Sequence, residues 1–157
     1  MAMGPRVVFT QFATARSPKL APWHSHSARV TGRSPVAELP APLGFADGGA
    51  VIWHLISGNN RMLARSAQVF GSMPEAVLGA ESAIAAVVHL VITLVDDGRG
   101  EHGWYAKLSG TPVLTCARWY LSERDRRNSV ESAITSLETA TLRARATTMS
   151  PSRTGAS

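Results

Sequence analysis

Residues 53–72, WHLISGNNRMLARSAQVFGS, decide the fold expected for this chain. Their first residues are aliphatic or aromatic and predict a strand, and Gly58-Asn59-Asn60 supplies residues that tolerate positive φ, as a tight hairpin requires. The following RMLARSAQVF predicts a return strand. Ser72-Met73-Pro74-Glu75 has the pattern of a capping box, which predicts the start of a helix. The expected unit is therefore strand, turn, strand and capped helix.

The same order recurs about 50 residues later in WYAKLSGTPVLTCARWYLS, residues 104–122, and each stretch is followed by ESAI, at 81–84 and 131–134. At an offset of 50 the matched pairs are Leu63 and Val113, Ala67 and Ala117, Phe70 and Tyr120, Ser72 and Ser122, and Glu75 and Asp125. The Ser-Gly turns match at an offset of 52, which predicts a second hairpin loop two residues shorter. A length change confined to a turn is what a duplication tolerates. The pattern therefore predicts an internal repeat.

These units set the expected organisation. Residues 48–95 form the first ββα repeat and residues 96–140 the second, and the two hairpins build one antiparallel sheet with both helices packed on one face. Residues 91–95 fit either an extension of the first helix or an extra strand. The flanks, 1–47 and 141–157, are rich in Pro, Ser and Arg and are predicted to be disordered. The N-terminal tail is interpreted either as a functional arm or as the product of an over-long start.

Both units resemble the YegP-like family of small bacterial domains, which commonly occur as tandem copies. The resemblance rests on WHLISGNNRMLARSAQVFGS and WYAKLSGTPVLTCARWYLS, each followed by ESAI, and covers roughly residues 51–140. This chain departs from the family pattern in two places. Its return strands are one residue longer before the closing aromatic, and the linker between the two copies is more apolar. The resemblance implies an α+β fold. It implies no established chemistry and no catalytic residues.

The distribution of charge argues against a basic folded core. The chain has 16 Lys and Arg against 11 Asp and Glu, but residues 48–140 hold eight basic and nine acidic residues. The basic excess therefore lies in the two flanks. Arginine outnumbers lysine 14 to 2, a bias typical of a high-GC genome.

Composition also indicates where the chain resides. One cysteine, Cys116, cannot form an internal disulfide, and this favours a reducing cytoplasm. The most apolar stretch, residues 76–95, reaches the length of a membrane span but contains Glu81 and His89. We therefore expect no membrane association.

No motif indicates catalysis. The sequence contains no Walker loop, dinucleotide fingerprint or nucleophile elbow. Cys116 lies opposite Ser66 in the repeat alignment, so a slot for a small side chain explains it better than a nucleophile does. His24 and His26 have a spacing that can ligate a metal, but no second cluster completes a site. We expect no enzyme, no cofactor and no metal.

Two functions remain. The first is a non-catalytic interaction or structural module with an unidentified protein partner, and a homodimer is left open. The alternative is association with nucleic acid through the Arg-bearing tails and the sheet aromatics. The candidate contacts for this alternative are Arg118, Trp119, Arg124, Arg126 and Arg127.

Overall fold

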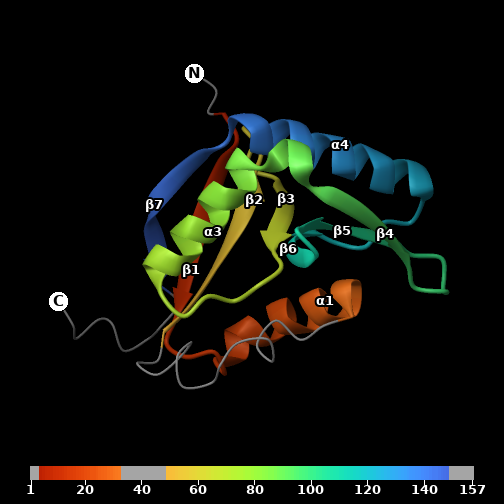
Figure 1. Ribbon diagram of the computed structural model, residues 1–157. Helices are drawn as coiled ribbons and strands as arrows, with labels where there is room; N and C mark the ends of the chain where they lie inside the picture. The colour runs from red at the N-terminus through yellow and green to blue at the C-terminus, as the bar shows by residue number, and fades with distance from the viewer. Residues whose placement is uncertain (1–3, 33–48, 149–157) are drawn as a thin grey trace.

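One mixed sheet flanked by helices forms the molecule (Figure 1). The computed structural model describes residues 4–32 and 49–148, with residues 143–148 described through their backbone. The strands are β1 (Arg6–Phe12), β2 (Ala50–Ile56), β3 (Met62–Ser66), β4 (Val91–Asp96), β5 (His102–Leu108), β6 (Thr111–Cys116) and β7 (Thr141–Thr148). The helices are α1 (Ala21–Thr31), α3 (Met73–Ala85) and α4 (Glu123–Thr139), with single turns η1 (Pro18–Leu20) and η2 (Val87–His89). The α+β class is confirmed.

Two hairpins, β2–β3 and β5–β6, meet at the centre of the seven-stranded order β4-β5-β6-β3-β2-β1-β7. Leu55 pairs with Ala64 in the first hairpin, and Ala106 pairs with Leu114 in the second. The register shifts directly after Leu55 in one hairpin and directly after Ala106 in the other. The strand pairs therefore correspond at offsets of 51 and 50, and the second hairpin is one residue shorter, not two.

The expected turn and helix starts are present. Ser109 and Gly110 both have positive φ, which makes the second hairpin a tight two-residue turn. The Ser72 hydroxyl accepts the backbone N–H of Glu75 at the start of α3. The Ser122 hydroxyl accepts the backbone N–H of Asp125 at the start of α4. Each cap satisfies an amide that has no partner within the helix.

The prediction of a disordered N-terminal tail is wrong for residues 6–31. Strand β1 lies inside the sheet, antiparallel to β2 and parallel to β7, and its Val7 and Phe9 are fully buried. The prediction took the prolines as breakers of regular structure, but they lie where they are tolerated. Pro5 precedes β1, and Pro22 lies in the first turn of α1, where a missing N–H costs nothing. Residues 33–48 lie outside the described residues.

The prediction for the C-terminal flank is likewise wrong for residues 141–148. They form β7, which takes the outer position beside β1. Strand β7 follows α4 as β4 follows α3, so each ββα segment continues into a further strand. Residues 91–95 are accordingly a strand and not a continued helix. Residues 149–157 lie outside the described residues.

The helices cover both faces of the sheet, whereas a single face was expected. Alternate residues of β2 point to opposite sides, as strand geometry requires. Trp53 and Leu55 pack in one core cluster with residues of α3 and α4, and Ile52 packs in a second cluster with Trp23 of α1. Figure 1 shows α1 below the sheet, across from α3 and α4. The two expected helices, α3 and α4, do pack on one face, and the additional helix α1 covers the other.

Helix α1 is held by polar contacts with the ends of the two central strands. The Trp23 Nε1–H and the Ser27 hydroxyl donate to the carbonyl oxygens of Ser66 and Ala67 at 3.2 and 2.7 Å. The His26 Nε2–H donates to the carbonyl of Cys116 at 2.7 Å. These donors satisfy carbonyls released where the strands β3 and β6 end. The helix thus ties both hairpins together.

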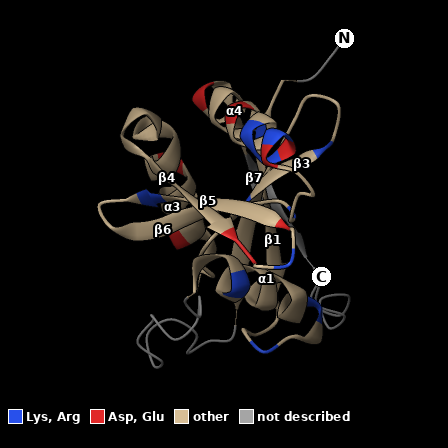
Figure 2. Cartoon of the chain, turned by 90° about the vertical axis from the view of Figure 1, so that its right-hand side faces the viewer, with Lys and Arg blue, Asp and Glu red and all other residues tan. Residues whose placement is uncertain are grey.

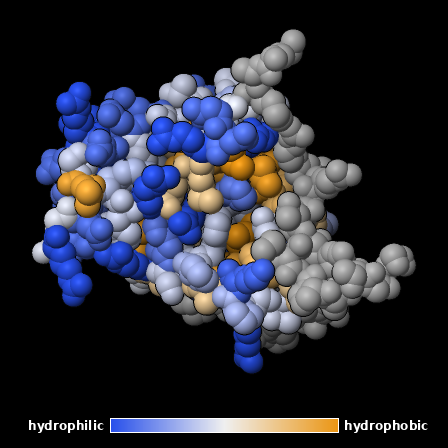
Figure 3. Space-filling view, turned by 180° about the vertical axis from the view of Figure 1, so that it is seen from behind, coloured by the Kyte–Doolittle hydropathy of each residue, from blue (hydrophilic) through white to orange (hydrophobic). Residues whose placement is uncertain are grey.

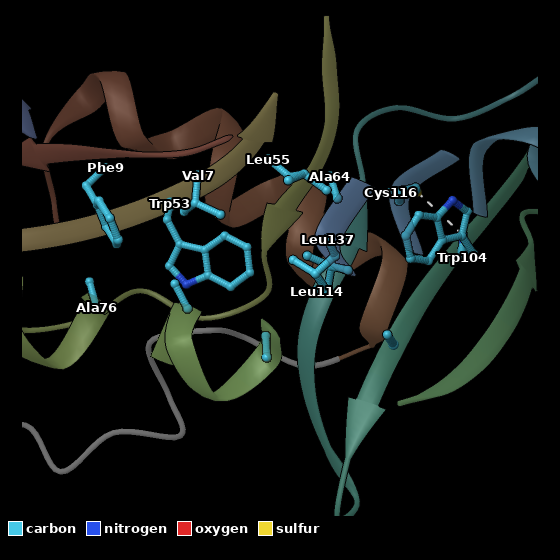
Figure 4. Packing of buried hydrophobic residues seen from close by; sticks show 14 of the residues in the cluster. Val7, Phe9, Trp53, Leu55, Ala64, Ala76, Trp104, Leu114, Cys116 and Leu137 are labelled. Atoms are coloured by element: carbon cyan, nitrogen blue, oxygen red, sulfur yellow. Dashed lines mark hydrogen bonds between the residues drawn. The ribbon is translucent and has the colours of Figure 1, made fainter. Parts of the chain in front are cut away.

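Two tryptophans and a stripe of small residues form the larger core (Figure 4). Trp53 and Trp104 are buried, at 1% and 0% exposure. The helices meet them with alanines, namely Ala76, Ala80 and Ala83 of α3 and Ala133 of α4. The larger Val77 and Ile84 of α3 are only partly buried. The small side chains on the helices leave room for the two bulky indoles in a close-packed core.

The apolar stretch 76–95 is divided among α3, η2 and β4. Among the residues that the structure describes, no helix combines the length and the apolar character needed to cross a bilayer.

Candidate functional site: a polar groove between α4 and the β2–β3 hairpin

An open groove of about 830 Å³ lies between α4 and the β2–β3 hairpin. We call it the α4 groove. Its lining residues are Ser57, Asn59, Arg61, Met62, Leu63, Arg118, Tyr120, Asp125, Asn128, Ser129, Glu131, Ser132, Thr135 and Ser136. Figure 2 shows the charged end of α4 beside the loop next to β3. The volume is within the range of small-molecule sites, about 300–1,000 Å³.

The spacing of residues along α4 explains its polar wall. Asp125, Asn128, Ser129, Ser132, Thr135 and Ser136 recur at intervals of three, four or one residues and so share one side of the helix. A different stripe, containing Ala133 and Leu137, is buried against the core. The helix therefore presents hydroxyl and amide groups to the groove while its apolar stripe holds it to the sheet.

A chain of hydrogen bonds fixes the floor of the groove. The Trp104 Nε1–H donates to the Ser129 hydroxyl at 2.9 Å, and this hydroxyl donates to the Tyr120 phenol oxygen at 2.8 Å. Burial raises the pKa of Tyr120, while the hydrogen bond from Ser129 and the charges of Arg118 and Arg61 act in the opposite direction. The phenol is therefore neutral and held in place at neutral pH.

Two arginines line the groove without an ion-pair partner. In the described part of the chain the ion pairs are Arg29 with Asp97 and Glu101, and Asp96 with His102 and Arg126. Arg61 comes from the β2–β3 hairpin and Arg118 from the segment that leaves β6, and both are exposed. The groove thus carries two unpaired guanidinium groups near one phenol.

The corresponding place beside α3 is built differently. There Phe70 corresponds to Tyr120 and Gly79 to Ser129. A Cβ on Gly79 would lie 2.7 Å from the Phe70 ring, so this ring occupies the space that the Ser129 side chain uses beside α4. The Trp53 Nε1–H is buried without a partner, whereas that of Trp104 donates to Ser129. The polar chain under the groove is specific to the second hairpin and α4.

The structure separates the residues expected to contact nucleic acid. Arg118 lines the α4 groove, and Arg124 and Arg127 are exposed at the start of α4, outside its lining. Arg126 is only 6% exposed and donates to the Val95 carbonyl at 3.2 Å and to Asp96 at 2.9 Å. Its assignment as a surface contact is wrong, because helical periodicity turns it inward between exposed neighbours.

Trp119 does not form an open stacking surface. It is half-buried, its Nε1 is buried, and the Arg29 guanidinium lies 4.3 Å from its ring centroid. Gly103 packs against the same indole, since a Cβ there would come within 3.1 Å of it. Arg29 thus covers a ring that a stacked base would have to reach.

Cys116 has the surroundings of a packing residue. It is fully buried, and burial raises the pKa of its thiol, which disfavours the reactive thiolate. Its sulfur accepts the Trp104 backbone N–H at 3.4 Å, and the Ser66 hydroxyl accepts the Trp53 backbone N–H at 3.2 Å. Serine and cysteine therefore perform the same structural task in the two hairpins.

The two histidines with metal-ligand spacing face different acceptors. The His24 Nε2–H donates to the Ala15 carbonyl at 2.9 Å, whereas His26 donates to Cys116. Within residues 4–32 and 49–148, no three His, Cys, Asp or Glu side chains gather as metal ligands would.

Sequence reasoning identified Arg118 but not the rest of the groove. Arg61 and Asn59 lie next to or within the expected hairpin turn, and Tyr120 enters the sequence pattern as the match of Phe70. The signal was the difference between the matched units: Gln68 against Arg118, Phe70 against Tyr120, and Gly79 against Ser129. Positions that gain a charge or a hydroxyl group in the second unit mark the groove.

Comparison with known proteins identifies the fold. No family model and no curated protein matches the chain. Among solved structures it is similar to the UPF0339 protein SO3888 from Shewanella oneidensis, with a TM-score of 0.50, 17% identity, and coverage of 65% of this chain and 83% of that one. The fold is similar to that of this UPF0339 protein. The protein yegP from E. coli, described as of unknown function, matches at a TM-score of 0.47 and 13% identity over 65% of this chain and 84% of its own.

Proposed function

We propose that this YegP-like protein is a non-catalytic binding module in which the α4 groove holds a small polar ligand. The observation that carries the proposal is the groove itself: about 830 Å³, lined by hydroxyl, amide, guanidinium and carboxylate groups from α4, the β2–β3 hairpin and the segment after β6. Neither histidine nor cysteine lines it, and the lone thiol of Cys116 is buried. The lining suits recognition more than nucleophilic chemistry.

We further infer that the scaffold arose by duplication. The two hairpins share their register and the position of their bulge, and both helices begin with a serine cap. The isolated bridge between Val51 and Phe70 corresponds to that between His102 and Tyr120. A duplication leaves one unit free to diverge, which supports a ligand site beside α4 only.

A groove-filling substitution tests the binding function. Ser132 is an exposed residue of the groove, and Ser82 is the matched exposed residue of α3. We expect ligand-observed NMR with a library of polar metabolites to find binders that Ser132→Trp abolishes and Ser82→Trp retains. Binders that both variants retain equally, or a library without any binder, would contradict the proposed function.

A second candidate function is self-association through β4. This strand forms one end of the sheet, and Val88, Val91 and Leu94 at this edge are 79%, 57% and 58% exposed. Residues 91–95 carry no charge or proline, the usual protection of an open edge. An antiparallel pair centred on Thr93 would place Val91 of one copy opposite Val95 of the other. We propose a homodimer formed in this way.

Sedimentation velocity tests the homodimer. We expect a concentration-dependent dimer that Leu94→Lys converts to monomer, because the substitution brings two charges into the pairing edge. Leu78→Lys is the matched control, since Leu78 is 62% exposed on α3, away from that edge. A monomeric wild-type chain, or equal loss of dimer in both variants, would refute pairing through β4.

Nucleic-acid association is the weaker alternative. It retains the exposed Arg118, Arg124 and Arg127 but loses the buried Arg126 and the covered Trp119. Binding to RNA or DNA that weakens steeply with salt and requires these three arginines would favour it. A cytoplasmic location is part of our proposal and accords with the single buried thiol.

A further inference from the structure

We propose that the α4 groove recognises a small hydroxylated anion, whose carboxylate or phosphate lies between Arg61 and Arg118. The inference rests on the proposed binding function and adds the chemical class of the ligand.

The first support is the position of the two arginines. They line one groove from different elements, the β2–β3 hairpin and the segment after β6. Both are exposed, and neither belongs to an ion pair of the described residues. Because guanidinium groups bind carboxylate and phosphate oxygens through directed hydrogen bonds, two unpaired ones in a concave site suit an anion.

The second support is the wall of α4. Ser132, Thr135 and Ser136 follow one another along the groove, and Asn128 adds an amide. Hydroxyl and amide groups both donate and accept hydrogen bonds, which suits a ligand with several hydroxyl groups. The Tyr120 phenol oxygen is held by Ser129 at the floor.

The acidic residues restrict the ligand further. Asp125 and Glu131 line the same groove and are exposed. They would repel an extended polyanion and accept hydrogen bonds from hydroxyl groups. The lining therefore favours one anionic group on a polyol over a nucleic-acid strand.

The view from behind shows a strongly hydrophilic surface with apolar side chains confined to smaller areas (Figure 3). The aliphatic side chains in the lining are Met62 and Leu63 of β3, and every other lining residue carries a hydroxyl, amide, guanidinium or carboxylate group. This favours polar over apolar ligands, since recognition depends on hydrogen bonds and charge.

Three probes of similar size test the inference: glucose 6-phosphate, gluconate and neutral glucose. Each is titrated into the 15N-labelled full chain at constant ionic strength. We expect one or both anionic probes to shift the amide resonances of the groove with an affinity at least about tenfold above that of glucose. If glucose 6-phosphate binds more tightly, the preferred anionic group is a phosphate; if gluconate binds more tightly, it is a carboxylate.

Arginine variants locate the anion. We expect the double substitution Arg61→Gln and Arg118→Gln to weaken anion binding at least about tenfold. The matched control is Arg124→Gln with Arg127→Gln, which removes the same charge from exposed residues outside the groove lining. The control should stay within about twofold of wild type, because screened distant charges contribute little. Amide spectra of both variants verify folding.

The opposing outcomes are distinct. Groove shifts with glucose equal to those with the anions, or equal weakening in both double variants, overturn the anion inference and leave the binding function standing. No groove shift with any probe overturns the anion inference as well. The library experiment with Ser132→Trp then decides the binding function independently.

Discussion

At the scale of single residues, a few matched positions distinguish the two halves of the sheet. Leu55 faces Ala64 in one hairpin, and Ala106 faces Leu114 in the other, so large and small side chains exchange places with little change in total volume. At another matched position, Ser66 in one hairpin is replaced by Cys116 in the other, and both side chains accept a tryptophan backbone N–H. Cores tolerate such volume-conserving changes, and the halves can therefore diverge in sequence while keeping one register.

Ser129 is expected to support both the core and the groove. Ser129→Ala removes the acceptor of the Trp104 Nε1–H and the donor to Tyr120, and we expect a loss of about 1–3 kcal/mol of unfolding free energy. Urea denaturation followed by tryptophan fluorescence measures it. Ser136→Ala, in the same groove, is the control. Equal stability of Ser129→Ala and wild type would show that the chain of hydrogen bonds contributes nothing.

Gly79 is expected to tolerate no side chain while Phe70 is present. Gly79→Ala places a methyl group within 2.7 Å of the Phe70 ring, and we expect about 1–3 kcal/mol of destabilisation from this overpacking. In a helix, replacing glycine by alanine normally raises the free energy of unfolding, so a decrease here would indicate the clash with Phe70. The measurement is the urea midpoint. Adding Phe70→Leu should restore part of the loss, and a stabilised single variant would contradict the packing.

At the scale of elements, α1 is the component that the repeat pattern did not predict. It packs Trp23 and Val30 inward and supplies polar donors to the ends of β3 and β6. The Arg65 guanidinium from β3 joins this layer by donating to the Ala117 carbonyl and lying over Trp23. The interface therefore combines a small apolar cluster with buried hydrogen bonds, which makes it sensitive to protonation.

The α1 face predicts a pH dependence of stability. The pKa of His26 and of His54 is lowered from 6.5 to about 4, first by burial and then by the charge of Arg65, with Arg29 adding to the effect at His26 and Arg6 at His54. In the window between 6.5 and about 4 the unfolded state binds protons that the native state does not. Stability is therefore full above this window and falls as pH decreases through it, by at most about 1.4 kcal/mol per pH unit for each histidine.

Urea denaturation at several pH values measures this dependence. We expect His26→Gln and His54→Gln each to flatten the slope within the window, because a glutamine cannot take up the proton. His89→Gln is the control, since His89 is exposed on η2. Identical slopes in wild type and both variants would show that neither histidine is linked to folding.

At the scale of the whole molecule, β1 makes the N-terminal region part of the sheet. It separates β2 from β7 and buries Val7 and Phe9 in the larger core. Without β1 the β2 edge and the last strand would lose their pairing. The folded unit therefore extends well beyond residues 48–140.

Truncation tests this extent. We expect a chain lacking residues 1–32 to lose cooperative unfolding, because it lacks both β1 and α1 and exposes apolar surface of two core clusters. Circular dichroism during thermal unfolding and amide dispersion in NMR spectra measure it. Removal of residues 149–157 is the matched control and should leave the transition unchanged. A cooperative transition in the N-terminal truncation would contradict the role of β1.

The local elements and their order were determined by the sequence alone. Alternating apolar residues, the Ser109-Gly110 turn and the serine caps act through contacts within a few residues, so β2, β3, α3, β5, β6 and α4 could be predicted. The shared structural role of Ser66 and Cys116 could also be predicted, because the repeat alignment places these two small side chains at the same position.

Only the tertiary structure decided the rest. The place of β1 depends on pairing with β2, whose partners lie 38 to 50 positions away, and with β7, whose partners lie more than 130 positions away. Local sequence patterns do not contain such pairing. The inward turn of Arg126 depends on Asp96 and the Val95 carbonyl, which β4 brings to it. The α4 groove joins residues 57–63 to residues 118–136. Long-range packing creates such sites, and so each arginine's role followed from its neighbours in space.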